Sequence, residues 1–148
     1  MAMVPRSYGK SRRTHGDIAT LSWEGGMKCL RVYADEKGES HFSEMEIAMS
    51  ESQPHFGRTI QMSTPAAATN VQFLTFPGGS SDWHPAPARQ FVISLDRTFE
   101  IETSDGQRRK VLPSSVVFVE DTWGKGHKII DEHGGTLIFV PLAGDKPG

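Results

Sequence analysis

Hydrophobic and polar residues alternate along most of this chain with a period of two, which is typical of β-strands that bury one face. The alternation is clearest over residues 28–33 and 98–103, which are also rich in β-branched and aromatic side chains. No stretch carries a 3.6-residue hydrophobic stripe over three helical turns. We therefore predict an all-β fold, either a sandwich or a small barrel. The predicted strands are residues 28–33, 44–49, 69–76, 89–95, 98–103, 107–112, 116–119, 127–130 and 136–142.

Turn residues separate these strands and help to place them. Residues 104–106 are Ser-Asp-Gly, and Asp-Gly accepts the positive φ angles of a hairpin turn. Residues 50–69 have few periodic apolar positions and are predicted to form a long connection. The apolar run 116–119 is predicted to be buried on both faces. Pro141 lies near the end of the last strand and indicates an edge strand.

The length of 148 residues fits one domain with its own hydrophobic core. Residues 1–26 differ from the rest, because the first sixteen contain four basic residues and no acidic one. We expect a flexible basic N-terminal arm at residues 1–26 and a barrel domain at residues 27–148. A basic, acid-poor start is also a property of mitochondrial presequences, but this one lacks a clear amphipathic stripe.

Charge and cysteine content exclude several classes of protein. The formal net charge is −2, whereas nucleic-acid binders usually present a basic face. There is no run of 18 apolar residues and no signal peptide, so we expect no membrane span. Cys29 is the single cysteine, which prevents an intrachain disulfide and favours a reducing compartment, the cytoplasm.

Two clusters of polar and aromatic residues stand out, at residues 78–90 and 120–127. Each cluster brings a histidine to the start of a strand or the turn before it, namely His84 and His127. In the first cluster Arg89 and Gln90 are neighbours on one predicted strand, so their side chains point to opposite faces. If Gln90 faces inward, Arg89 faces outward and pairs with an acid.

The first cluster resembles the first motif of the cupin superfamily. That motif runs glycine, five residues, His-x-His, three or four residues, glutamate, six residues and glycine. Gly78 and His84 match the first glycine and the first histidine in spacing. Ala86 stands at the second histidine, Gln90 at the glutamate and Arg97 at the closing glycine.

The second cluster resembles the second cupin motif, which has a Pro-Gly-Asp turn, a strand and a histidine. Residues 113–115 are Pro-Ser-Ser in place of the turn, and His127 matches the histidine. The resemblance covers about residues 28–142. It implies a small single-domain cupin with a jelly-roll barrel (a double-stranded β-helix) and a homodimer as its usual assembly.

The resemblance also implies a metal site, but this chain departs from its pattern. A typical cupin site uses three histidines and a glutamate, whereas His84, Gln90 and His127 offer two imidazoles and a neutral amide. Such a set would bind a divalent ion (Fe, Mn, Zn or Ni) weakly, because no anion offsets the charge of the ion. Glu120 or Asp121 could supply the missing carboxylate.

The function we predict is that of an enzyme acting on a small organic molecule inside the barrel. His84 and His127 would transfer protons, since imidazole titrates near neutral pH, and Gln90 would hold a substrate oxygen. Lyase, isomerase or cyclase chemistry suits such a site, because these reactions need no redox centre. The predicted substrate-binding residues are Trp83, Trp123 and His41, although tryptophans at such positions also serve as packing residues.

Two alternatives remain open from the sequence. One is a metal-dependent, dioxygenase-like cupin, and the other is a cupin that binds a small ligand without turnover. A storage or structural role fits the small size and the clustered histidines less well.

Overall fold

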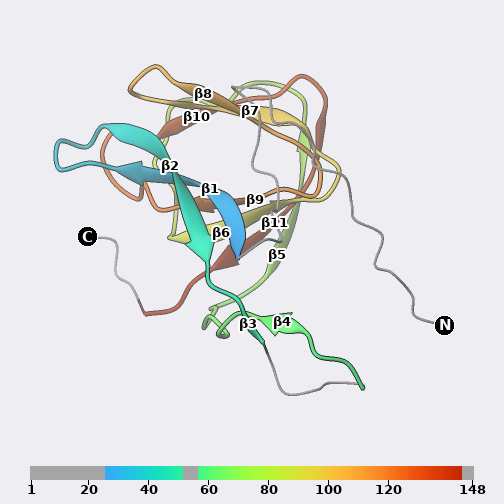
Figure 1. Ribbon diagram of the computed structural model, residues 1–148. Coiled ribbons are helices and arrows are strands. Elements are labelled where there is room, and N and C mark those ends of the chain that lie inside the picture. The colour runs from blue at the N-terminus through green and yellow to red at the C-terminus, as the bar shows by residue number, and fades with distance from the viewer. Residues whose placement is uncertain (1–25, 52–56, 145–148) are drawn as a thin grey trace.

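The structure is a computed structural model in which residues 26–51 and 57–144 are described (Figure 1). Within these residues there is no helix, as the sequence pattern predicts. Of the expected N-terminal arm, residues 1–25 lie outside the described part. The strands are β1 (Met27–Ala34), β2 (Ser40–Ile47), β3 (Ser50–Glu51), β4 (Gln61–Met62), β5 (Gln72–Pro77), β6 (Gln90–Ser94), β7 (Phe99–Thr103), β8 (Arg108–Val111), β9 (Val116–Val119), β10 (His127–Ile130) and β11 (Gly134–Pro141).

The strands form two main sheets that face each other. The larger sheet has six strands in the order β2-β1-β9-β6-β11-β5, and the smaller has three in the order β10-β7-β8. Strands β3 and β4 form a separate short pair. Figure 1 shows β7, β8 and β10 on the opposite side of the molecule from β1, β9, β6 and β11. The all-β prediction is confirmed, and two facing sheets are the arrangement expected of a jelly roll.

The core lies between the two sheets and follows from the alternation in the sequence. Along β6 and β7 every second residue is buried, so each strand turns one face inward. Burying one large aliphatic or aromatic side chain contributes about 1.5–3 kcal/mol to folding. The buried apolar cluster is Leu30, Val32, Ala86, Val92, Phe99, Ile101, Val111, Val117, Val119 and Leu137.

Several local predictions can be compared directly with the strands. Strands β9 and β10 have the bounds predicted for them. Gly106 has a φ of 87°, and the Gly106 N–H donates to the Thr103 carbonyl in the predicted hairpin turn. The prediction of an edge strand at Pro141 is wrong, because β11 lies between β6 and β5. Pro141 is the last residue of β11, where a missing N–H disturbs the hydrogen-bonded ladder least.

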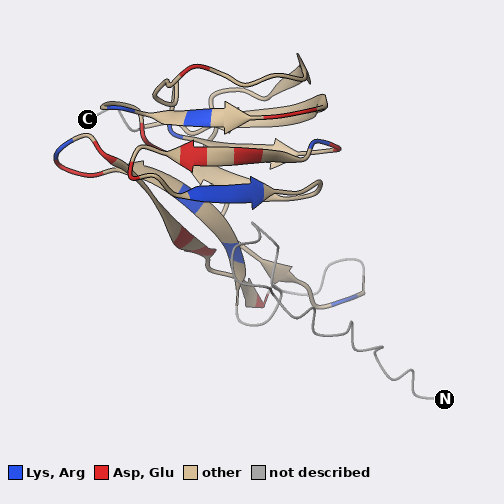
Figure 2. Cartoon of the chain, turned by 90° about the horizontal axis from the view of Figure 1, so that it is seen from above, with Lys and Arg blue, Asp and Glu red and all other residues tan. Residues whose placement is uncertain are grey.

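Charges of both signs lie side by side on the smaller sheet. Figure 2 shows acidic positions on β7 next to basic positions on β8. Arg108 lies 2.9 Å from Glu102 and 4.0 Å from Glu100.

Across residues 26–51 and 57–144, no helix combines the length and apolarity needed to cross a membrane. The homodimer stays a prediction, which sedimentation velocity of the full chain would test.

Candidate functional site

A cavity of about 500 Å³ lies between the two sheets. This volume is within the range of roughly 300–1,000 Å³ that is common for small-molecule sites. Its wall is mostly apolar, with three aromatic rings and several aliphatic side chains. The wall residues are Phe76, Pro77, Gly78, Gly79, Ser80, Ser81, His84, Pro85, Ala86, Pro87, Gln90, Val92, Arg97, Phe99, Ile101, Val117, Val119, His127, Ile129, Leu137 and Phe139.

The segment 78–87 closes one side of the cavity and is held to β10 by its backbone. His84 and His127 form an antiparallel bridge, in which each backbone N–H donates to the carbonyl of the other residue at 2.9–3.0 Å. The N–H groups of Gly79 and Ser81 donate to the carbonyls of Asp131 and Ile129. The main chain therefore fixes the two histidines opposite each other.

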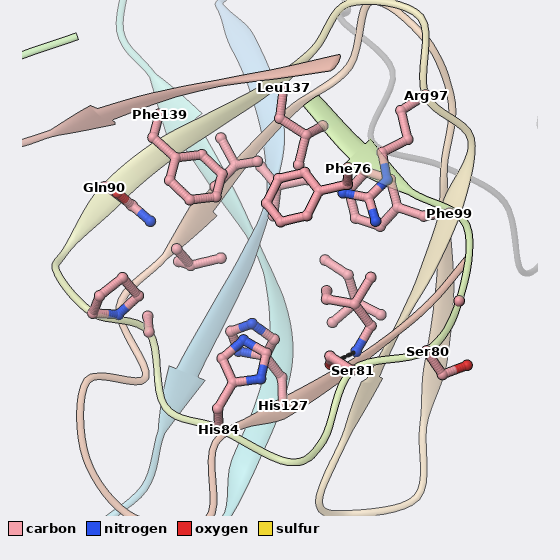
Figure 3. A pocket seen from close by; sticks show the side chains of 18 of the residues that line it. Phe76, Ser80, Ser81, His84, Gln90, Arg97, Phe99, His127, Leu137 and Phe139 are labelled. Carbon is pink, nitrogen blue, oxygen red and sulfur yellow. Dashed lines mark hydrogen bonds between the residues drawn. The ribbon is translucent and has the colours of Figure 1, made fainter. Parts of the chain in front are cut away.

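The two imidazole rings lie together at the cavity wall (Figure 3). Their centroids are 4.7 Å apart and their planes are inclined by 60°. His84 Nδ1 lies 2.8 Å from the Asp82 carbonyl oxygen, and His127 Nδ1 lies 2.7 Å from Asp121 Oδ2. Both partners are acceptors, so each Nδ1 carries a proton and donates it. In the neutral rings, Nε2 then has a lone pair that no hydrogen bond to a described residue uses.

Asp121 supports His127 from behind the cavity wall. Its side chain is fully buried, and Oδ2 accepts the bond from the imidazole. Asp121 Oδ1 is buried and has no hydrogen-bond partner among the described residues. A proton taken up at His127 Nε2 would place a cation beside this carboxylate, and opposite charges attract strongly where water is excluded.

Gln90 is the third polar group that the sequence assigns to the site, and the structure brings it to the same cavity. It is only 2% exposed, and Figure 3 shows its amide directed into the cavity. No hydrogen bond joins this amide to any residue in the described ranges. The amide borders the cavity, so a molecule bound there can form hydrogen bonds with it. Its neighbour Arg89 faces outward and bonds Glu120 Oε2 at 2.9 Å, as predicted.

Arg97 and Asp131 form a buried ion pair at another side of the cavity. Arg97 Nε donates to Asp131 Oδ2, and both side chains are at most 5% exposed. Burial raises the pKa of Asp131, but hydrogen bonds from the Gly134 N–H, the guanidinium and the His133 N–H outweigh it and lower the pKa below its usual value. Asp131 is therefore an anion that offsets the charge of Arg97.

Three residues predicted to bind substrate do not line this cavity. Trp83 and Trp123 are 45% and 42% exposed, so their rings lie on the surface. His41 is on β2 and contacts the turn at Asp35 and the hairpin at Asp105. The structure does not bring these three side chains to His84 and His127, and we leave them out of the proposed site.

His41 instead belongs to a cluster of charged groups. Nε2 lies 2.7 Å from Asp35 Oδ2, and Nδ1 lies 3.0 Å from Asp105 Oδ2. The hydrogen bond to Asp35 and then that to Asp105 raise the pKa of His41 despite its desolvation. The hydrogen bond from His41 lowers the pKa of Asp35. For Asp105, desolvation is outweighed by hydrogen bonds that lower its pKa, first from the Thr103 hydroxyl.

The His41 cluster predicts a pH dependence of stability. A raised pKa means that the contribution of His41 is complete below its ordinary pKa, about 6.5, and is lost as pH rises through the folded-state pKa. The lowered pKa values of Asp35 and Asp105 keep their contributions intact above about pH 4. We expect His41→Gln to lower the melting temperature most between about pH 4.5 and 6 and least above pH 8. Thermal melts across this range test it, and an equal loss at every pH would contradict it.

The donor set of this cavity does not fit the cupin metal centre. The described residues contain no group of three or more His, Cys, Asp or Glu side chains placed to hold an ion. Glu120 bonds Arg31 and Arg89, and its pKa is lowered because these bonds outweigh its burial. Asp121 is occupied by His127 Nδ1. Neither carboxylate supplies the missing anionic ligand, so we derive no step through a metal.

Sequence reasoning missed the roles of Asp121, Arg97 and Asp131. The sequence offers Asp121 as a metal ligand, whereas the structure places it as the partner of His127. Arg97 stands out in the sequence only because it replaces a motif glycine. The sequence around Arg97, which follows Asp96 between two predicted strands, carries no signal of its burial.

Fold and cavity together define an all-β protein with two facing sheets around a small-molecule-sized cavity. No protein-family model and no curated protein matches the chain. Among solved structures, it is similar to the crystal structure of protein NMB1881 from Neisseria meningitidis. The TM-score is 0.41 at 14% identity, over 57% of this chain and 88% of that chain. A likeness at this level carries no argument about function.

Proposed function

We propose that this chain is a small cupin enzyme that binds a small organic compound between its sheets and catalyses a proton transfer of the lyase, isomerase or cyclase type. The observation that carries the proposal is the pair His84 and His127. Both Nδ1 atoms are held by acceptors, so both Nε2 atoms are left to act on a molecule in the cavity. We also propose the cytoplasm as its compartment, since Cys29 is the single cysteine of the chain and is a free thiol.

The two histidines suit different roles in one proton-transfer reaction. His127 suits the role of the base, because an imidazolium formed at His127 would lie beside the Asp121 carboxylate. His84, with ring centroids 4.7 Å away, can exchange a proton at a neighbouring atom of the same molecule. Gln90 can donate a hydrogen bond to a substrate oxygen on which negative charge develops.

Solvent deuterium exchange tests this proposal without knowledge of the product. The protein is incubated in D₂O with small carbonyl and hydroxy acid compounds, and ¹H NMR follows the loss of acidic C–H signals. We expect exchange with the wild type and a loss of about 100-fold or more in His84→Ala and His127→Ala, since positioned acid–base groups contribute about 10²–10⁴-fold. Trp83→Ala is the matched control, because Trp83 adjoins His84 in sequence but lies on the surface.

Two outcomes would contradict the proposed catalysis. Exchange that persists in both histidine variants would remove the histidines from the chemistry. A compound that binds without any exchange would instead support a non-catalytic binding module. Metal analysis of the same wild-type protein provides a separate check, because activity that disappears on chelation would favour the metal-dependent alternative.

A further inference from the structure

Arg97 is a buried cation on the wall of a cavity that is otherwise mostly apolar. Its side chain is held in place on several sides. The guanidinium carbon lies 4.6 Å from the ring centre of Phe76 and 5.0 Å from that of Phe99. Ser94 Oγ accepts from the Arg97 N–H and donates to the Arg97 carbonyl, which fixes the backbone. The guanidinium is therefore preorganised rather than free to swing away.

The hydrogen-bonding capacity of Arg97 is only partly used. A guanidinium has five N–H donors, and the ion pair with Asp131 engages Nε. Among the described residues, none accepts a hydrogen bond from Nη1 or Nη2. Asp121 Oδ1 is the fully buried side-chain atom without a partner in the described residues, so the Nη groups of Arg97 border the cavity, where an acceptor on a bound molecule can reach them.

The ion pair with Asp131 leaves Arg97 able to bind a second anion. Asp131 does not depend on Arg97 alone, because its Oδ1 accepts from the N–H groups of His133 at 3.0 Å and Gly134 at 2.9 Å. A ligand that binds the Nη groups therefore need not take Asp131 away from its other donors. A planar guanidinium with two free Nη groups matches the two oxygens of a carboxylate.

The cation and the histidine pair lie at different sides of the same cavity. Figure 3 shows Arg97 apart from His84 and His127, with Phe76 and Leu137 on the same wall. A ligand that reaches both sides would have a charged end, an apolar body and a reacting end.

We propose that the ligand of this cavity is an apolar organic acid, whose carboxylate binds Arg97 while its other end lies at the histidine pair. This inference rests on the proposed function, because it uses the same cavity and assigns the substrate class. The acid anchors at the Nη groups, its apolar part packs on the aromatic wall, and the carbon or oxygen that exchanges a proton is at His84 and His127.

Matched acid and amide probes test the anchor. Isothermal titration calorimetry measures the binding of trans-cinnamate and 4-phenylbutyrate, and of their primary amides, to the full chain. We expect each acid to bind the wild type about tenfold or more tightly than its amide, as expected for charge-assisted hydrogen bonds. Arg97→Lys keeps a cation beside Asp131 but removes the planar pair of donors, so it should reduce this preference about tenfold while amide binding stays the same.

Arg89→Lys is the matched control, because Arg89 pairs with Glu120 outside the cavity, and it should change neither affinity. The wild-type comparison needs no variant, so it stands even where Arg97→Lys folds poorly. Equal binding of acid and amide, no acid binding at millimolar concentration, or an unchanged preference in a folded Arg97→Lys protein would each overturn the proposal.

Measurements on the same wild-type and variant proteins distinguish a failure of this inference from a failure of the proposed function. Deuterium exchange in a neutral compound, together with no preference for acids, would refute the Arg97 anchor and leave the histidine chemistry standing. Acid binding that depends on Arg97 but shows no exchange in the wild type would support the anchor and contradict the proposed catalysis. His84→Ala should lose exchange and keep the preference for the acid over its amide, because that preference is assigned to Arg97.

Discussion

Replacing Gly126 with alanine is expected to lower the free energy of unfolding by about 3 kcal/mol. Gly126 has a φ of 71°, a conformation that L side chains rarely adopt. An added Cβ would lie 2.1 Å from the carbonyl carbon and oxygen of His84. Because these neighbours are backbone atoms, the segment carrying His84 has to move away from β10. The variant should therefore lose both stability and the approach of the two histidines.

Urea denaturation of the wild type and of Gly126→Ala measures this loss. Gly106→Ala is the matched control, because Gly106 has a similar φ of 87° but no atom within 4 Å of an added Cβ. It should cost only about 1–2 kcal/mol, which is the backbone contribution alone. If the two variants are equally stable, the contact between the segment 78–87 and β10 is looser than the structure shows.

The second large effect is expected at Asp131. Asp131→Asn leaves the Arg97 cation buried without its anion, and breaking a buried pair in this way typically costs about 3–5 kcal/mol. The double replacement Arg97→Met with Asp131→Asn removes both charges, keeps a side-chain oxygen for the N–H groups of His133 and Gly134, and should recover most of that loss. The pKa of Asp131 is lowered, so its contribution is present above its ordinary pKa and is lost as the pH falls through the folded-state value.

A double-mutant cycle in urea at neutral pH checks the Asp131 prediction. The exposed pair Lys28 and Glu44, 3.5 Å apart on β1 and β2, is the control. Glu44→Gln should change stability by less than about 1 kcal/mol, because solvent screens an exposed pair. A double variant as unstable as Asp131→Asn would show that packing, rather than the unpaired charge, is responsible.

Much of the fold could be predicted from the sequence, because strand alternation is a local property. The apolar run 116–119 and the segment 127–130 have the predicted bounds as β9 and β10. The position of β11 within its sheet could not be predicted in this way. Edge or interior depends on which distant strands pair, and Pro141 is compatible with both because it ends its strand.

Three residues of the site could be predicted from their positions along the chain. His84, Gln90 and His127 line one cavity, since Gln90 and His127 each begin a strand and backbone hydrogen bonds hold His84 opposite His127. Arg97 follows Asp96 between two strands, a context that is typical of an exposed turn. Its burial depends on Asp131, 34 residues further along the chain, and on two aromatic rings that pack against it. A buried charge whose partners lie so far away along the chain leaves no local pattern in the sequence.

The backbone bridge between His84 and His127 has a consequence for how this protein could be redesigned. Since main-chain hydrogen bonds set the spacing of the two rings, the apolar wall can be altered without moving them. Val92 and Phe139 on the larger sheet could be exchanged for larger or smaller side chains to admit different acids. Under the proposed function, the groups that react would then be separate from the groups that choose the ligand, which would make this fold a suitable starting point for directed evolution toward new substrates.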